Sequence, residues 1–120
     1  MLQPSMRIKS EIWVMAYLRR CSFNGAPAVI ARRGQGDGGA IFIRINTLDS
    51  QASVYGPALA GLDESSTERR WSLCCGEGAV SDTEADSYLK RQAEFDPDIW
   101  VIEVEDRDGR HFLGESLSKG

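Results

Sequence analysis

The chain has few of the residues that most often carry catalysis or hold metals. Its 120 residues include one histidine, His111, and three cysteines, Cys21, Cys74 and Cys75. An odd, unevenly spaced set of cysteines is not typical of a small secreted disulfide scaffold. Cys-x-x-Cys and a closely spaced second histidine are both absent, so we predict no metal and no cofactor, and buried cysteines that act as small apolar groups. Pairing of Cys74 or Cys75 with His111 as a catalytic dyad stays an alternative, because it depends on proximity in space.

Long apolar segments are also missing. The longest run, Ile12 to Leu18, is too short to span a bilayer, and residues 1–7 lack the apolar core of a secretory signal. We therefore predict a cytoplasmic protein that does not enter a membrane. The net charge of −4 makes nucleic acid an improbable partner, because general nucleic-acid binding needs a basic surface.

What the chain does contain is an ordinary globular composition, with 42% hydrophobic and 27% charged residues. Its length suits one domain with one core. We expect a single α+β domain over residues 6–114, with flexible termini at residues 1–5 and 115–120.

Two segments have the features of helices. The first begins near Ser10, which can cap it, and ends at Asn24-Gly25. This segment is apolar nearly all round, so we expect the helix to be largely buried. The second begins at Ser81, where Ser81-Asp-Thr-Glu84 fits a capping box, and ends at Asp96-Pro97.

The remaining apolar segments predict strands. Residues 40–46 and 99–105 alternate in polarity, which is typical of strands. Shorter candidates lie at residues 28–32, 53–55 and 70–75, and residues 110–113 could add a closing hairpin strand. The order of elements predicts a mainly antiparallel sheet of about five strands, with two helices packed on one of its faces.

A glycine-rich segment covers residues 34–39. A phosphate-binding loop would need a strand before it and a helix after it, and it would carry Gly-Lys-Ser/Thr. Here a strand follows, so we interpret the segment as a loop between two strands.

Acidic residues crowd into the stretch from Asp96 to Asp108. Glu103 and Glu105 share one strand face, about 7 Å apart by strand rise. Such a pair could hold a hard cation such as magnesium, with His111 as a general base. The commoner alternative is a solvated strand face on which these glutamates pair with arginines.

Arginines form a second candidate surface, which could bind a small anion or nucleotide. The arginine candidates are Arg19, Arg20, Arg32, Arg33 and Arg44. Salt bridges to the acidic half of the chain are the simpler interpretation. Further candidate binding residues from the acidic stretch are Asp96, Asp98, Trp100, Asp106, Arg107 and Arg110.

Several motifs together resemble the domain of unknown function 1491 family. They are Arg7-Ile-Lys-Ser-Glu-Ile-Trp-Val14, Arg19-Arg20, Gly39-Ala-Ile-Phe-Ile43, Tyr55-Gly-Pro57, Phe95-Asp-Pro-Asp-Ile-Trp-Val-Ile-Glu-Val-Glu-Asp-Arg107 and Gly109-Arg-His-Phe-Leu113. The resemblance runs from about Met6 to Leu113. It implies a small, mainly alphaproteobacterial, cytoplasmic protein with one compact domain, and it supplies no activity, cofactor or catalytic residue.

We therefore infer the function from the small number of catalytic residue types and from the residues that could form an interface. With one histidine and few catalytic residue types, we favour a non-enzymatic interaction or regulatory module that forms a homodimer or binds a protein partner. Trp13, Trp71 and Trp100 could line the interface, and sheet edges need a partner or a cover. The alternatives are a metal-dependent hydrolase or nuclease-like enzyme at Glu103 and Glu105, and anion or nucleotide binding by the arginines.

Overall fold

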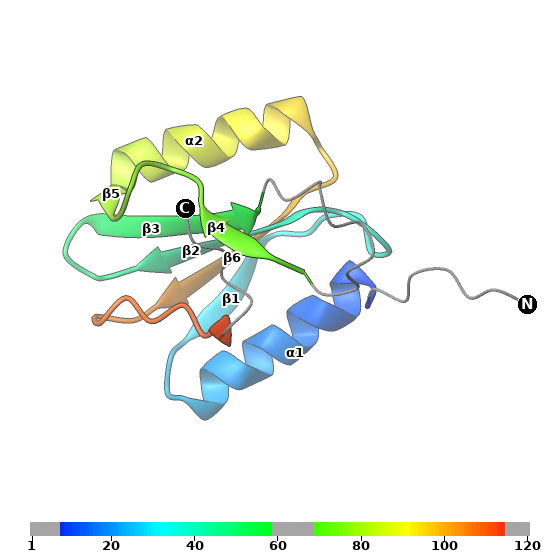
Figure 1. Ribbon diagram of the computed structural model, residues 1–120, viewed down its shortest axis with the longest axis horizontal. Coiled ribbons are helices and arrows are strands. Elements are labelled where there is room, and N and C mark those ends of the chain that lie inside the picture. The colour runs from blue at the N-terminus through cyan, green and yellow to red at the C-terminus, as the bar shows by residue number, and fades with distance from the viewer. Residues whose placement is uncertain (1–7, 59–68, 115–120) are drawn as a thin grey trace, which may run out of the picture.

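The computed structural model describes residues 8–58 and 69–114, which form a sheet with one helix on each face (Figure 1). The expected flexible termini lie outside the described residues, as do residues 59–68. The elements are α1 (Ser10–Phe23), β1 (Ala28–Arg32), β2 (Ile41–Asn46), β3 (Gln51–Pro57), β4 (Trp71–Leu73), β5 (Val80–Ser81), α2 (Asp82–Phe95) and β6 (Trp100–Glu105).

The sheet has six strands in the order β1-β6-β2-β3-β4, with β5 paired to β3. Four of the five strand pairs are antiparallel, and the central pair, β2 with β6, is parallel. The predicted α+β class and mainly antiparallel sheet are confirmed. The parallel pair arises because the chain passes through α2 before it returns to the sheet as β6.

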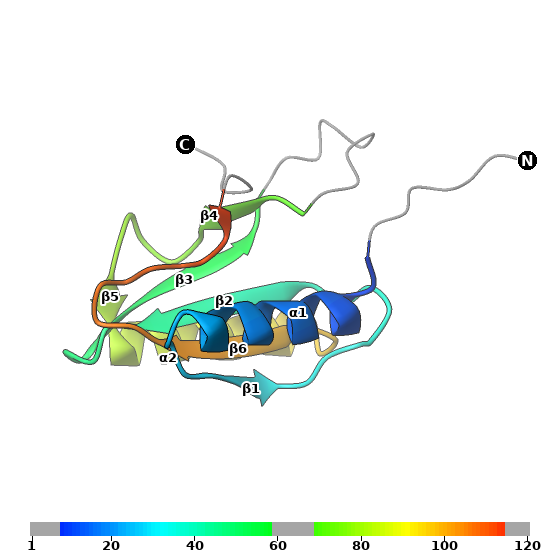
Figure 2. The ribbon, with the colours of Figure 1, turned by 90° about the horizontal axis from the view of Figure 1, so that it is seen from below.

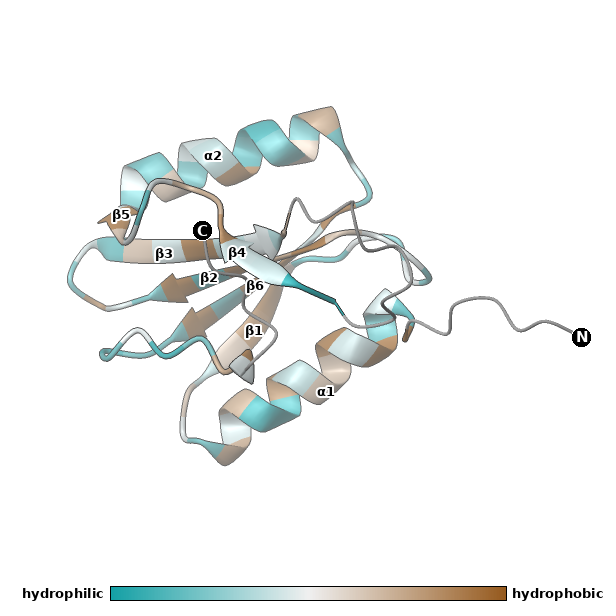
Figure 3. Ribbon diagram, viewed as in Figure 1, coloured by the Kyte–Doolittle hydropathy of each residue, from teal (hydrophilic) through white to brown (hydrophobic). Residues whose placement is uncertain are grey.

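The two central strands are buried on both faces. In β6, Trp100, Ile102 and Val104 point toward α1, and Val101 belongs to the core beneath α2. The same alternation holds in β2, where the isoleucines at positions 41, 43 and 45 face α1. Figure 3 shows brown, hydrophobic stretches on both strands.

Each face of these strands therefore needs its own cover, and the helices lie on opposite faces. Val14, Tyr17 and Cys21 of α1 pack on one face, and Ala85 and Leu89 of α2 pack on the other. Figure 2 shows α1 in front of the sheet and α2 behind it. The expectation that both helices share one face is wrong.

The outer side of α1 is apolar and exposed. Ile12 and Met15 are 57% and 50% exposed, Phe23 is 93% exposed, and Ile8 just before the helix is 54% exposed. The expectation of a largely buried helix is therefore wrong. A helix that lies on one face of a sheet buries one stripe only, and apolar residues all round leave the opposite stripe in solvent.

The start of α1 is capped by backbone rather than by a side chain. The Ser10 hydroxyl is buried and donates to the Gly39 carbonyl oxygen at 2.6 Å, so Ser10 is not the predicted N-cap. The Ser10 and Glu11 amides donate to the carbonyl oxygens of Asp37 and Gly36. The glycine-rich loop thus occupies amides that an anion would otherwise contact. In α2, by contrast, Ser81 accepts from the Glu84 amide as predicted.

The same loop packs closely against the start of β6. A Cβ atom added to Gly34 or Gly39 would lie 2.3 Å from the Asp98 carbonyl oxygen, closer than real Cβ atoms approach. The Gln35 amide donates to that oxygen at 2.9 Å, and the Trp100 indole donates to the Gln35 carbonyl at 2.8 Å. Glycine is needed here because the two backbones approach so closely.

Residues after β6 do not form the expected closing strand. The segment from Arg110 to Leu113 has no strand structure. Phe112 has a φ of 59°, outside the extended region, which is incompatible with a regular strand. Figure 2 shows this segment, in orange to red, crossing the α1 face toward β4.

We expect Gly39→Ala to lower the free energy of unfolding by about 1–3 kcal/mol, because the added methyl group forces the loop away from Asp98. Gly38→Ala is the matched control, since a Cβ atom there meets nothing within 4 Å. Urea unfolding of both variants measures the difference. Equal stability of the two variants would show that the close backbone approach is unimportant.

Candidate functional site

The acidic stretch does not form one site, because the sheet separates its members. Glu103 and Glu105 share one face of β6, as their spacing predicts. This is the face that points toward α2. His111 lies on the α1 face, with its ring edge-on to Tyr55 at 5.3 Å between centroids. The glutamates and the proposed general base are therefore not brought together.

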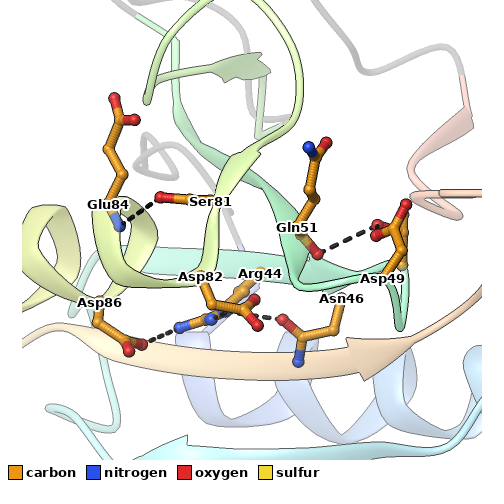
Figure 4. A network of polar contacts seen from close by, with 9 residues as sticks. Arg44, Asn46, Asp49, Gln51, Ser81, Asp82, Glu84 and Asp86 are labelled. Atoms are coloured by element: carbon orange, nitrogen blue, oxygen red, sulfur yellow. Dashed lines mark hydrogen bonds and ion pairs between the residues drawn. The ribbon is translucent and has the colours of Figure 1, made fainter.

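Glu103 lies beside a buried arginine. In the parallel β2–β6 register, Glu103 is the partner of Arg44, whose side chain is 8% exposed. Arg44 donates to Asp82 at 3.0 Å, to Asp86, and to the Asn46 side chain at 2.7 Å. Figure 4 shows the guanidinium between the two aspartates of α2.

The charges in this network indicate a structural role: the Arg44 guanidinium of β2 pairs with two aspartates of α2 and holds the helix against the sheet. Burial alone would lower the Arg44 pKa, but the hydrogen bonds that Arg44 donates to Asp86 and Asp82 outweigh it and raise that pKa. The guanidinium is an ion-pair partner for both carboxylates. Among residues 8–58 and 69–114, no three His, Cys, Asp or Glu side chains gather closely enough to hold a metal ion.

The other half of the stretch is bound to the glycine-rich loop. The Asp96 carboxylate accepts from the Asp98 amide at 3.0 Å, in the turn that ends α2. The Pro97 carbonyl accepts from Arg32 at 2.9 Å. Trp100 is buried and has Arg33 over its ring at 5.1 Å. Asp96, Asp98 and Trp100, predicted as binding residues, here position backbone.

Asp106 and Arg110 form a turn after β6. Asp106 is buried, and its carboxylate accepts from both the backbone amide and the guanidinium of Arg110. The Arg110 hydrogen bonds hold the Asp106 pKa below its usual range. Arg107, between them, is exposed.

Residues 111–113 are then fastened to α1. The Tyr17 hydroxyl donates to the His111 carbonyl at 2.7 Å, and Arg20 donates to the Phe112 carbonyl at 2.8 Å. Leu113 is buried in the core beneath α1. We call residues 111–113 with Tyr17 and Arg20 the C-terminal clasp. Sequence patterns indicate no role for Tyr17 and a different role for Arg20, because both side chains bind backbone carbonyls, which leave no signal in the sequence.

The arginine candidates are spread over the molecule. Arg19 and Arg20 lie in the last half of α1, whereas Arg32 and Arg33 lie at the far end of β1. Arg44 is on the opposite face, under α2. Arg33 pairs with Glu11 at 2.7 Å. The five side chains do not converge on one anion site.

The cysteines do not pair with the histidine. Cys74 and Cys75 contact the core beneath α2, and His111 lies on the other face. Burial raises the pKa of all three thiols, which keeps them protonated and poor nucleophiles. The arrangement agrees with the prediction of cysteines as small apolar groups.

The tryptophans are mainly structural. Trp71 and Trp100 are buried in the core, and Trp13 packs at 4.9 Å from Trp71 and stacks on Tyr17 at 5.0 Å. The three tryptophans therefore do not form the exposed surface that was expected to line an interface. The exposed apolar residues of α1 are the alternative candidate.

These features define a small α+β protein in which the glycine-rich loop and the C-terminal clasp hold α1 on the sheet. The outer side of α1 stays exposed to solvent. The family model described as "Protein of unknown function (DUF1491)" matches residues 8–114, so the chain belongs to that family. The resemblance carried by its motifs is thereby confirmed.

Solved structures support the same assignment. A crystal structure of a DUF1491 family protein from Caulobacter crescentus CB15 is 35% identical, with a TM-score of 0.78 over 95% of this chain and 100% of that one. An NMR structure of a DUF1491 family protein from the same organism is 36% identical, with a TM-score of 0.77 over 95% and 99%. A solution structure of a protein from A. tumefaciens is 34% identical, with a TM-score of 0.73 over 93% of each chain.

The search of curated proteins found no match. In the part of the chain that the structure describes, neither helix is long and apolar enough to cross a membrane.

Disrupting the Arg44 network should lower the free energy of unfolding. Replacing Asp82 and Asp86 together by Asn should destabilise the fold by about 1–3 kcal/mol, because a buried guanidinium loses both carboxylates. Arg44→Met should cost less, since it removes the buried charge itself. Glu84→Gln controls for the loss of an acidic residue from the first turn of α2.

Chemical unfolding of the purified variants measures these differences. If the double aspartate variant were no less stable than Glu84→Gln, the network would be an incidental surface contact.

Proposed function

We propose that this protein is a non-enzymatic interaction module and that it uses the outer stripe of α1 to form a homodimer. The observation that carries the proposal is the row of exposed apolar side chains at Ile8, Ile12, Met15 and Phe23. Contiguous exposed apolar residues on a small protein are typical of interaction sites.

Helical spacing places Ile12, Met15 and Phe23 on one side of α1, and Ile8 lies just before the helix. Ile12, Arg19 and Phe23 project within about 40° of one another around the helix axis, with Met15 beside them. The core-facing residues, Val14 and Tyr17 among them, project away from this stripe. We call Ile8, Ile12, Met15, Arg19 and Phe23 the outer stripe.

The outer stripe suits a second copy of itself. Two antiparallel copies of α1, related by a twofold axis at the level of Met15, would place Ile8 beside Phe23 of the second copy. Ile12 would then pack on the aliphatic part of Arg19 of the second copy. Lys9 and Arg20, on the flank, are already engaged by Asp37 and the Phe112 carbonyl. One helix face is a small interface, so we expect a weak dimer.

The sheet edges are less suited to self-association. β1 contains an irregularity between Ile30 and Arg32, and such bulges discourage pairing with another strand. At the other end of the sheet, β4 has three residues. We therefore favour α1 over an extended intermolecular sheet.

The two alternatives from the sequence gain no support from the geometry. A cation-dependent hydrolase would need Glu103 and Glu105 near a base, and His111 lies across the sheet. Anion binding would need convergent arginines, which are distributed over both faces. We also propose a bacterial, cytoplasmic protein. Its support is the bacterial source of a similar protein and the three unpaired cysteines.

Ile12→Lys should abolish self-association, because it places a charge within the outer stripe without affecting the core. Val29→Lys is the matched control: Val29 is exposed to 59% but lies on β1, away from the stripe. Sedimentation equilibrium over a range of concentrations measures the mass. A wild-type protein that stays monomeric at the highest concentration, or a dimer that Ile12→Lys leaves intact, would refute the proposal.

A further inference from the structure

The C-terminal clasp contains a hydrogen-bond acceptor, His111 Nδ1, that can accept only while the imidazole is neutral. His111 Nδ1 accepts a hydrogen bond from the Leu113 amide at 2.9 Å. A neutral imidazole can do this with Nε2 protonated, whereas an imidazolium carries a proton on both nitrogens and has no acceptor. Protonation therefore replaces this hydrogen bond with two N–H groups that point at each other.

This hydrogen bond holds a backbone of unusual shape. Phe112 has a φ of 59°, in the left-handed region that a phenylalanine seldom adopts. The bond between the residues on either side closes the turn around it. Leu113 is buried in the core under α1, so opening the turn withdraws an apolar anchor.

No neighbouring charge compensates for a positive imidazole among the described residues. From β3, Tyr55 faces the ring, and from α1, Tyr17, Arg20 and Cys21 surround the clasp. The Asp106 carboxylate, which accepts from the Arg110 amide just before the turn, is paired with the Arg110 guanidinium. Tyr17, Tyr55 and Cys21 are neutral when protonated and burial raises the pKa of each, so none of them supplies a negative charge to the ring.

We propose that His111 is an acid-sensitive latch, whose protonation at Nδ1 opens the turn and releases residues 111–113 from α1. This inference goes beyond the proposed function and is independent of whether α1 dimerises. The chain has a single histidine, so no second imidazole titrates in the same pH range.

The sign of the pH dependence follows from the burial. Burial lowers the His111 pKa below its ordinary value of 6.5, so the closed clasp binds the proton less readily than the open one. The stabilisation is therefore complete above the ordinary pKa. It is lost as the pH falls from there through the lowered pKa of the closed state.

The test is amide hydrogen exchange on the ¹⁵N-labelled full chain, followed by NMR between about pH 7 and about pH 5. After correction for intrinsic exchange, the protection of the Leu113 amide should fall as His111 titrates. The fall should be about tenfold for each pH unit between the ordinary pKa and that of the closed clasp. Amides in β2 and β6 should keep their protection, which distinguishes local opening from global unfolding.

Two substitutions complete the test. In His111→Asn, the side-chain oxygen can replace Nδ1 as acceptor at every pH, so protection of Leu113 should persist and become independent of pH. In His111→Phe, which has no acceptor, protection should be low throughout. Wild-type protection that does not change while the imidazole resonances titrate would overturn the latch, and that measurement requires no variant.

Discussion

The start of α1 is held by one contact, the packing of the glycine-rich loop between the first turn of the helix and the start of β6. The Gly36 and Asp37 carbonyls accept from the first amides of α1, and Gly34 and Gly39 lie against the Asp98 carbonyl. These groups satisfy one another, so the Ser10 and Glu11 amides are not left to bind an anion. The composition of the glycine-rich loop at residues 34–39 is similar to that of phosphate-binding loops, but the loop instead connects α1 to the start of β6.

A second fastening holds the other end of the helix. The turn at Asp106 and Arg110 directs residues 111–113 under α1, where Tyr17 and Arg20 donate to their carbonyls. The motifs that identify the family thus contribute mainly to fixing α1 on the sheet. With both ends fixed and the inner stripe buried, the exposed outer stripe is a rigid surface, and a rigid apolar surface can bind a partner at low entropic cost.

Sequence patterns predicted the parts of this fold that depend on local chemistry. The alternation in β2 and β6 and the Ser81 cap of α2 can be read from neighbouring residues, and each is confirmed. The opposite placement of the helices, the parallel β2–β6 pair and the exposure of Ile12 depend on long-range packing. The candidate site was less predictable, because spacing along β6 placed Glu103 and Glu105 on one face but could not place His111 across the sheet.

We propose that α1, and not the acidic stretch from Asp96 to Asp108, is the interacting surface. The most direct measurement is a dilution series of ¹⁵N-labelled protein followed by amide chemical shifts. Resonances of Ile12, Met15, Arg19 and Phe23 should move with concentration, while those of Glu103 and Glu105 stay constant. Shifts confined to the acidic face of β6, or no concentration dependence on α1, would contradict the account.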